Sequence, residues 1–286
     1  MKKLLLVVCM LSTGSMCWAQ APSLGAAATF AVLGSAVTCT GPGVISGDVG
    51  ATGAFTNTPV CTIAGGTPPA TDAAAILAQT ALTNAYNAIN PINPTNCGTT
   101  ISTAAFTDTA LGPLAPGVYC FPAAVAFTRT TLTLDGSTNP NGIWIFEVGA
   151  ALAGTNFQVI LLNGAQPCNV FWSVGAAVTL TSSSTTMPLI FQGNILAGAT
   201  GGAITITGGN LIGRVLANGA VTLTGPNVNG LCALVDQAKA SCKNDKDDRD
   251  EDKDHHDRDD DRDKDHRDRD KDHDRDHKDN NHRDDD

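Results

Sequence analysis

The sequence predicts an all-β fold of the solenoid type, with one long helix and a highly charged C-terminal tail. Three observations carry this prediction. A short motif of the form apolar, Thr, apolar, Thr recurs along the chain, a second set of apolar strands recurs between its copies, and only one segment has the pattern of a long helix. Repeats of this kind are typical of solenoids, in which each coil covers the apolar side of the next.

The repeated motif is clearest in residues 203–210, Ala-Ile-Thr-Ile-Thr-Gly-Gly-Asn. Successive side chains of a strand point to opposite faces, so each copy buries its apolar residues and presents both Thr hydroxyls on the other side. Four steps between copies cover 89 residues, which indicates a coil of about 22 residues. Close copies begin at Val37, Val178 and Val221, and looser copies with Asp or Asn in place of Thr begin at Leu132 and Ile160.

A second set of strands, rich in aromatic and branched residues, fits the same register. Because two strands repeat together, the pattern indicates a regular stack of coils. The early copy at Val37 most resembles the last copy at Val221, which predicts that the N-terminal coil stacks beside the C-terminal coil, out of sequence order. The strands of the second set are residues 143–149, 169–175, 189–193 and 211–214.

Residues 1–19 have the pattern of a secretory signal peptide. Two lysines precede an apolar run over residues 4–11, and a small-residue cleavage site ends at Ala19. We therefore expect a secreted, extracellular protein whose mature chain begins at Gln20. No membrane span is expected in the mature chain, because nothing later reaches the roughly 18 uninterrupted apolar residues that a span needs.

Charge is distributed very unevenly over the 286 residues. The tail, residues 243–286, holds 13 of the 18 Lys and Arg, 22 of the 28 Asp and Glu, and all six His. The body is nearly uncharged and rich in small and branched residues, so we expect one domain over residues 20–242 with a packed interior. No basic patch is present in this body, so no nucleic-acid partner is expected.

The tail alternates Asp with Lys, Arg and His and contains no apolar residue, which predicts disorder. His255 and His256, between two aspartates, are the best candidates for a metal ligand. No spacing in the tail fixes a coordination geometry, however, and a solvated segment of mixed charge is the simpler interpretation. The sequence therefore predicts no metal site and no cofactor.

Residues 71–90 form the segment with a helical pattern. Thr71 can cap the helix, Ala dominates its middle and a proline follows its end. Leu82, Tyr86 and Ile89 follow helical spacing and should lie against the solenoid.

The segments on either side of this helix predict irregular structure. Residues 51–69 are rich in Gly, Thr and Pro and predict a loop. Residues from about 95 to 126 carry three prolines and predict an irregular cap over one end of the stack, where unpaired strand edges need covering. Regular coils are expected over residues 127–230.

Seven cysteines remain after two leave with the signal peptide, and export favours disulfides. Cys61 and Cys97 bracket the predicted helix, and Cys232 and Cys242 bracket the last segment of the body. We predict the pairs Cys61–Cys97 and Cys232–Cys242, although spacing alone leaves the connectivity open. Cys39 lies on the apolar side of its strand and is expected as a buried thiol.

The body has no histidine and no adjacent pair of acidic residues. A polysaccharide-cleaving solenoid would need paired carboxylates, a metal site or a nucleophile beside a base. Glu147 lies in a strand among large apolar residues and is interpreted as an outward-facing charge. We therefore predict no catalytic residues and no enzymatic activity.

The Thr-rich side of the solenoid is the candidate binding surface. Thr residues at i and i+2 lie roughly 6.6 to 6.8 Å apart, and adjacent coils stack roughly 4.7 to 4.9 Å apart. This grid of methyls and hydroxyls is commensurate with repeats in the ice lattice, and Thr holds few rotamers, so little entropy is lost on binding. Two rungs, Thr133/Asp135 and Leu161/Asn163, are expected to interrupt it. The predicted contacts to ice or ordered water are Thr38, Thr40, Thr179, Thr181, Thr205, Thr207, Asn210, Thr222, Thr224 and Asn227.

Several short motifs, in order over about residues 22–230, carry a resemblance to a known family. They include Phe30-Ala31-Val32-Leu33-Gly34, Ile45-Ser46-Gly47-Asp48-Val49-Gly50, Pro116-Gly117-Val118-Tyr119, Asn141-Gly142-Ile143-Trp144 and Gly213-Arg214-Val215-Leu216-Ala217. Through them the chain resembles the ice-binding-protein-like family of secreted microbial β-solenoids. The resemblance implies a right-handed solenoid of triangular cross-section, one long helix packed alongside, and adsorption to ice through one flat face. The turns at residues 207–210 and 224–227 match the Thr-Gly-x-Asn turns of family members with a clear ice face.

We therefore predict a secreted, non-enzymatic protein that adsorbs to ice through its Thr-rich face and inhibits ice growth or recrystallisation. An alternative keeps the same scaffold as a cell-surface or matrix adhesion module. Such a module would bind extracellular polysaccharide or protein, with the charged tail as a tether.

Overall fold

The computed structural model describes residues 19–58, 61–64, 73–89, 97–198 and 201–230. Contacts divide the chain into two units, Met1–Lys243 and Asn244–Asp286, and every described residue belongs to the first. The fold below is that of this first unit. Outside the described residues lie the predicted signal peptide apart from Ala19, the tail with His255 and His256, and the predicted pair Cys232–Cys242.

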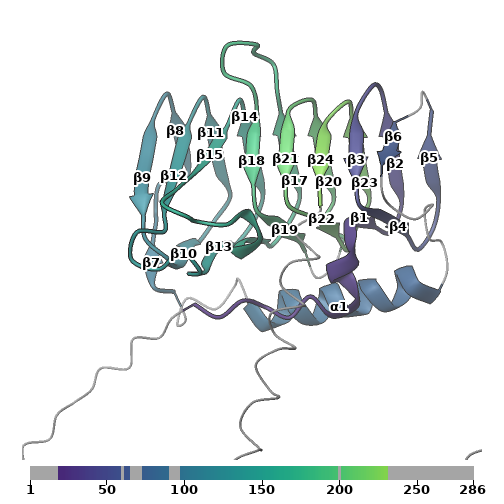
Figure 1. Cartoon of the computed structure of the whole chain (residues 1–286), viewed down its shortest axis with the longest axis horizontal. Helices are drawn as coiled ribbons and strands as arrows, with labels where there is room; N and C mark the ends of the chain where they lie inside the picture. Colours follow the sequence, from purple (N-terminus) through teal and green to yellow (C-terminus); the bar gives the residue numbers. More distant parts are fainter. Residues whose placement is uncertain (1–18, 59–60, 65–72, 90–96, 199–200, 231–286) are drawn as a thin grey trace, which may run out of the picture. The chain divides into compact units, whose positions relative to one another are not determined.

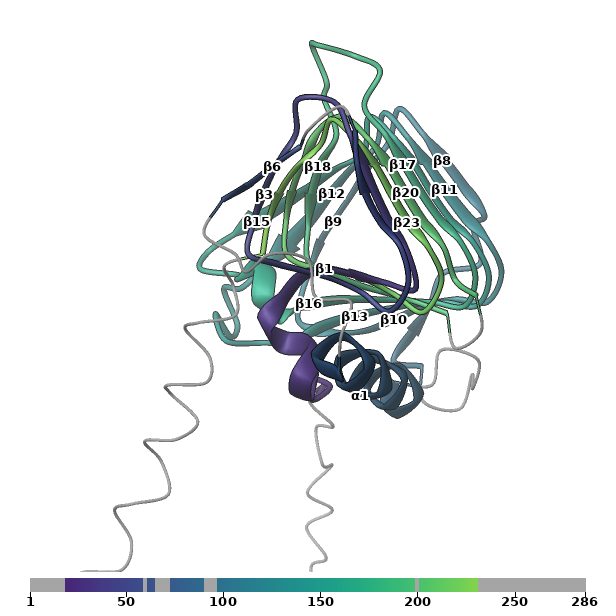
Figure 2. The ribbon, with the colours of Figure 1, turned by 90° about the vertical axis from the view of Figure 1, so that its right-hand side faces the viewer.

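Three parallel sheets of eight strands each form the three sides of a triangular solenoid, seen end on in Figure 2. The predicted solenoid class and triangular section are confirmed. Sheet A runs in spatial order through β4 (Asp48–Ala51), β1 (Phe30–Gly34), β22 (Val215–Ala217), β19 (Asn194–Ala197), β16 (Val170–Val174), β13 (Trp144–Val148), β10 (Gly117–Phe121) and β7 (Thr99–Thr100).

Sheets B and C repeat the same order of coils. Sheet B consists of β5 (Phe55–Asn57), β2 (Val37–Thr40), β23 (Val221–Thr224), β20 (Ile204–Thr207), β17 (Val178–Thr181), β14 (Leu152–Thr155), β11 (Val125–Thr128) and β8 (Ala105–Thr107). Sheet C consists of β6 (Thr62–Ala64), β3 (Val44–Ser46), β24 (Asn227–Asn229), β21 (Asn210–Ile212), β18 (Ile190–Gln192), β15 (Gln158–Leu162), β12 (Thr131–Asp135) and β9 (Ala110–Leu114).

The order of coils in space differs from their order in the sequence. The first coil, β1 to β3, pairs with the last coil, β22 to β24, on all three sheets. On its other side it pairs with β4 to β6, which form one end of the stack, so that purple and green strands lie side by side in Figure 1. The prediction that the N-terminal coil stacks out of sequence order is confirmed.

Helix α1 (Ala73–Ile89) packs against the outer surface of sheet A (Figure 2), and residues 71, 72 and 90 of the predicted helix lie outside the described residues. Leu82, Tyr86 and Ile89 are buried in a cluster with the outward Leu, Ile and Phe side chains of sheet A, as predicted. A short 3-10 helix (Gly25–Thr29) leads into β1 and packs against α1, and a second one (Pro167–Asn169) precedes β16. One side of the triangle is thereby covered.

The interior of the triangle is filled by apolar side chains from all three sheets. In the coils from β7 to β18 much of this filling is aromatic. Phe127 and Phe157 stack with ring centroids 4.4 Å apart, and Phe146 and Trp172 stack at 4.2 Å. Rings from successive coils thus form columns along the axis, which add dispersion contact to the burial of apolar area.

Both segments predicted to be irregular contain regular strands in their described parts. Within residues 51–69 the chain forms β5 and β6, and within residues 97–126 it forms β7 to β10 and the start of β11. These strands build the two end coils and the coil beside one of them. The prediction was wrong here because strands of two to five residues are too short to show an alternating pattern, and prolines mask it further.

The register of two predicted repeats was also wrong. The copies that begin at Leu132 and Ile160 belong to β12 and β15 on sheet C, not to the sheet that carries the close copies. The second strand set divides likewise, with residues 144–148 and 170–174 on sheet A and residues 190–192 and 210–212 on sheet C. Each coil has three strands, one on each sheet. An interpretation with two strands per coil therefore assigns strands of different sheets to the same face.

Disulfides connect Cys39 to Cys61 and Cys97 to Cys120, so the predicted pair Cys61–Cys97 is wrong. Cys39 is buried as expected, but it is not a free thiol. Cys61 and Cys97 precede strands of opposite end coils, so no bond can join them. Each observed bond instead connects an end coil to its inner neighbour, where an end coil has pairing partners on one side only.

Candidate functional site

The outward positions of sheet B form a regular array, called the Thr face below. Parallel pairing places the first outward residues of all eight strands in one column and the second outward residues of seven strands in another. The first column reads Thr56, Thr38, Thr222, Thr205, Thr179, Ala153, Ala126 and Ala105. The second reads Thr40, Thr224, Thr207, Thr181, Thr155, Thr128 and Thr107.

Beneath this array, the alternate side chains of the same strands anchor each rung in the core. Val37, Val178, Ile204 and Val221 lie at the first inward position and are at most 1% exposed. Leu180, Ile206 and Leu223 lie at the second inward position and are fully buried. The motif of apolar residues alternating with Thr therefore places a packed core on one side of the sheet and hydroxyls on the other.

A ladder of backbone hydrogen bonds fixes the spacing of the second column. The N–H of the residue after each second Thr donates to the carbonyl oxygen of the second Thr in the neighbouring coil. Six such bonds, 2.8 to 3.0 Å long, run without a break from Asp108 to Gly225. Because each coil repeats the same bond, the seven Thr of this column are held at one constant step.

The corner that follows the second column is equally regular. In six of the seven coils the residue after the second Thr adopts a positive φ, between 47° and 83°. In three coils this residue is glycine, Gly41, Gly208 and Gly225, and in three others it is Asp108, Arg129 and Asn156. A left-handed residue turns the chain sharply from sheet B into sheet C, which explains the Gly of the Thr-Gly-x-Asn turns.

The Thr face carries no charge within its two columns. Its Thr side chains are exposed or half-buried, and the hydroxyl of Thr40 donates to the hydroxyl of Thr224 at 3.4 Å. Charge begins only at the far corner, where Arg129 and Asp108 form a two-pronged ion pair that lowers the pKa of the Asp108 carboxyl. Within its two columns, the Thr face therefore offers a ligand a regular and uncharged surface.

The structure places the predicted contact residues on two sheets. All eight predicted Thr, at positions 38, 40, 179, 181, 205, 207, 222 and 224, lie together on the Thr face. Asn210 and Asn227 lie beyond the corner, at the start of β21 and β24 on sheet C. The Asn227 amide donates to Asn210 Oδ1 at 3.0 Å, and its Oδ1 accepts from the Val44 N–H at 3.2 Å. Their amides therefore connect neighbouring coils along the corner.

Four Thr of the face were missed in the sequence. Thr56 lies in a segment interpreted as a loop, and Thr107, Thr128 and Thr155 follow Phe or Gly instead of the usual Val, Ile or Leu. A signal was present, because each of the last three precedes a residue that adopts the left-handed region. The expected interruptions at Thr133/Asp135 and Leu161/Asn163 do not occur on this face, because β12 and β15 belong to sheet C and Asn163 follows β15.

A long loop, residues 182–189, projects from the corner between β17 and β18 (Figures 1 and 2). Asn156 holds its base from the neighbouring coil. The Asn156 Oδ1 accepts the N–H groups of Ser183 and Ser184 at 2.8 and 3.1 Å, and its amide donates to Ser183 Oγ at 3.0 Å. The loop is thus fixed at the edge of the Thr face.

The environment of Glu147 differs from the predicted one. It was expected as an outward-facing charge, but its side chain is only 3% exposed on the outer side of sheet A, and burial raises its pKa to about 7. The apolar helix α1 and the N-terminal segment cover this sheet, which the strand pattern alone did not reveal. Among the described residues that line the adjacent pocket, Glu147 is the acidic one. The described residues also hold no group of three or more His, Cys, Asp or Glu that suits a metal.

No helix among the described residues is long and apolar enough to cross a membrane. The only long one, α1, has 17 residues and carries Gln, Thr and Asn side chains along its length. Its buried residues contact sheet A. Within the described part of the chain, this helix belongs to the solenoid.

Comparison with known proteins agrees with the fold. A family model described as Ice-binding-like matches residues 32–229. An ice-binding protein of Nostoc sp. (strain HG1) is 36% identical over 223 residues, which cover 76% of this chain and 77% of that protein. The crystal structure of an ice-binding protein from the Antarctic ascomycete Antarctomyces psychrotrophicus matches with a TM-score of 0.63 and 30% identity, over 73% of this chain and 98% of its own. An ice-binding protein from an Antarctic Biological Consortium matches with a TM-score of 0.61 and 30% identity, over 73% of this chain and 91% of its own.

Proposed function

This chain belongs to the ice-binding-like family, and from that premise we propose that it adsorbs to ice through the Thr face and inhibits ice growth or recrystallisation. The observation that carries the choice of face is the pair of Thr columns on sheet B. Sheet A is covered by α1, and sheet C mixes Asn, Gln, Ile, Leu, Thr and Asp at its outward positions. Only sheet B repeats one residue type at one spacing.

The physical basis of adsorption is the summation of many weak contacts. Each Thr offers a methyl, which fits against an ordered water cage, and a hydroxyl, which joins the hydrogen bonds of that cage. The backbone ladder holds these groups at a step of roughly 4.8 Å, so the surface is already ordered before it meets ice. Since Thr has few χ1 rotamers to lose, the entropic penalty of binding is small.

The face is graded along the stack. Four coils, those of β2, β23, β20 and β17, carry Thr in both columns, whereas those of β14, β11 and β8 carry Ala in the first column and Thr in the second. The half with paired Thr supplies two hydroxyls per rung. We therefore place the centre of the ice contact on the β23 and β20 strands, each of which has on both sides a strand with Thr in both columns.

The test is the double substitution Thr205→Tyr with Thr222→Tyr, measured as thermal hysteresis and recrystallisation inhibition of residues 20–242. Two bulky rings at adjacent positions of the first column lift a flat surface away from ice, so most of the activity should be lost. The matched control is Thr131→Tyr with Thr133→Tyr, two outward Thr of β12 on sheet C, which should retain parental activity. Equal losses from both pairs, with folding intact, would place the ice contact elsewhere.

The remaining parts of the proposal concern where the protein acts and what it does not do. The signal pattern of residues 1–19 and the disulfides of the end coils support an extracellular site. A non-enzymatic role agrees with the family and with the isolation of Glu147 from other acids. The adhesion alternative gains no support from the fold or from these relatives.

A further inference from the structure

Glu147 is a buried acid that the Thr face does not use. Its side chain lines a cavity of about 370 Å³ between the outer surface of sheet A, the end of α1 and the N-terminal segment. Besides Glu147, sheet A and α1 contribute Ala88, Ile89, Val118 and Ile145 to the cavity wall, all of which are apolar. Burying an ionised carboxylate in such surroundings is unfavourable unless a cation accompanies it.

The body of the protein offers almost no cation for this role. Residues 19–230 contain only two cationic side chains, Arg129 and Arg214. Arg129 pairs with Asp108 at the corner of sheets B and C. Arg214 donates to the Ala28 carbonyl and to Asn194 Oδ1. Within the described residues, no cationic side chain lies within ion-pair distance of Glu147.

The neighbours of Glu147 on its own sheet leave its charge uncompensated. Cys120 Sγ lies 3.4 Å from Oε2, but this sulfur is bonded to Cys97 and has no proton to donate. Ser173 is the register partner on the other side, and its buried hydroxyl finds no hydrogen-bond partner within the described residues. A polar environment is thus present on the sheet, but it lacks a positive charge.

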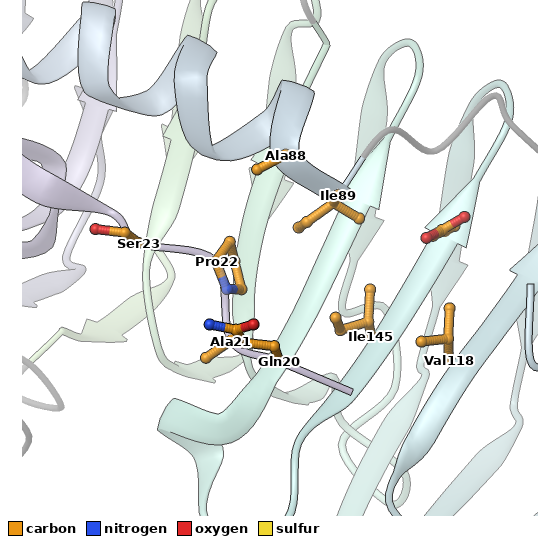
Figure 3. A pocket seen from close by; sticks show the side chains of 9 residues that line it. Gln20, Ala21, Pro22, Ser23, Ala88, Ile89, Val118 and Ile145 are labelled. Atoms are coloured by element: carbon orange, nitrogen blue, oxygen red, sulfur yellow. The ribbon is translucent and has the colours of Figure 1, made fainter. Parts of the chain in front are cut away.

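The same cavity is lined by the residues that would begin the mature chain. Gln20, Ala21, Pro22 and Ser23 are among its lining residues, and Figure 3 shows Gln20 and Ala21 beside Ile145, below the end of α1. Removal of residues 1–19 would leave a free α-amino group on Gln20. That group is protonated near neutral pH, since its ordinary pKa is about 7.7 to 8.0.

We propose that the α-ammonium group of Gln20, created when the signal peptide is removed, binds the Glu147 carboxylate in this cavity. The site is then a processing-dependent ion pair, absent from the precursor and formed only in the mature chain. It anchors the N-terminal segment across sheet A beside the end of α1. In the chain that still carries residues 1–19, the pKa of Glu147 is raised because burial of the carboxylate is not offset by a positive charge. This agrees with an ion pair that forms only after cleavage.

The first measurement is the intact mass of the exported protein. A mass that begins at Gln20 with its amine unmodified is expected. A different first residue, or a mass lower by one ammonia from cyclisation of Gln20, would overturn the proposal, since either removes the cation from the cavity.

The second measurement isolates the ion pair by a double-mutant cycle. All chains begin at residue 20 and carry Gln20→Ala to prevent cyclisation. The α-amino group is either free or acetylated, and residue 147 is either Glu or, in the Glu147→Gln variant, Gln. The four resulting proteins are compared. Acetylation should lower the thermal midpoint at neutral pH only when Glu147 is present. Asp135→Asn, which removes a half-buried acid on sheet C, is the control that should leave the acetylation effect unchanged. The same effect of acetylation with and without Glu147 would refute the pairing.

A third measurement needs no substitution of Glu147, in case that variant folds poorly. The pKa of the α-amino group in the mature chain, obtained from the pH dependence of its labelling, is compared with that of a peptide of residues 20–25. An opposite charge within 4 to 6 Å should raise this pKa by about 1 or more. Equal values in protein and peptide would show that the amine faces solvent.

Discussion

At the scale of single residues, the left-handed position after the second Thr column sets the shape of the corner. Asn156 occupies it in one coil with the same backbone turn that Gly208 and Gly225 make in others. Asn and Asp tolerate this region better than other residues with a Cβ, and β-branched residues tolerate it worst. The residue type that follows the second Thr is therefore constrained by the left-handed backbone conformation at that position.

Gly225 provides a clean test, because an added Cβ would meet only Pro42 Cδ at an ordinary distance of 3.7 Å. Substitutions at Gly225 should therefore differ in stability only through the backbone strain of a positive φ. Gly225→Val should lower the free energy of unfolding by about 1 to 2 kcal/mol, and Gly225→Asn by clearly less. Urea unfolding measures both, and equal losses would show that the corner does not depend on its positive φ.

At the scale of elements, α1 acts as a cover for sheet A and does not extend the Thr face. Its buried side, with Leu82 and Tyr86, contacts the outward leucines and aromatics of that sheet. Its other side exposes Ile76 and Leu77. The helix thus removes from water the apolar outer surface of one side of the triangle, which supplies stability in proportion to the apolar area buried.

Two leucines of the same helix provide matched substitutions. Leu82 is fully buried, and Leu82→Ala should lower the free energy of unfolding by about 2 to 5 kcal/mol. Leu77 is 63% exposed, and Leu77→Ala should change it by less than about 0.5 kcal/mol. Similar values for the two variants, from chemical denaturation, would contradict the packing of α1 on sheet A.

The elements also show how far sequence reasoning reaches. Alternation identified all four strands with paired Thr, because an apolar residue at every second position (Val, Ile, Leu or, in β2, Cys39) is a strong signal. It missed Thr155 and Thr128, whose strands present Ala153 and Ala126 on the same face. It also assigned β12 and β15 to this face, because period two shows which side of a strand is buried but not which of three sheets the strand joins. The burial of Glu147 depends on α1, which lies far away in the sequence.

At the scale of the whole molecule, two disulfides between described cysteines hold the ends of the stack. Inner coils have hydrogen-bonded neighbours on both sides, whereas the coils of β4 to β6 and β7 to β9 have them on one side. Cys39–Cys61 and Cys97–Cys120 each join such an end coil to the next coil inward. Each covalent bond thus lies where strands have the fewest hydrogen-bonded neighbours. Such exposed sheet edges could otherwise unfold locally or pair with strands of another molecule.

Removing each bond separately tests this arrangement. The pairs Cys39→Ser with Cys61→Ser, and Cys97→Ser with Cys120→Ser, should each lower stability by about 2 to 4 kcal/mol. Amide hydrogen exchange should quicken in the adjacent end coil, while β17 and β20 stay protected and thermal hysteresis persists. Exchange that quickens uniformly through all coils would show that the ends do not unfold separately.

The insertion of the first coil between the last coil and an end coil has a consequence for biogenesis. Strands β1 to β3 leave the ribosome early, yet their partners β22 to β24 are made some 180 residues later, as the 183-residue separation of Thr40 and Leu223 illustrates. A chain that crosses a membrane from its N-terminus cannot complete this stack until nearly all of it has emerged. For a chain exported as proposed above, this order would keep the stack incomplete inside the cell, so that assembly would finish only after export.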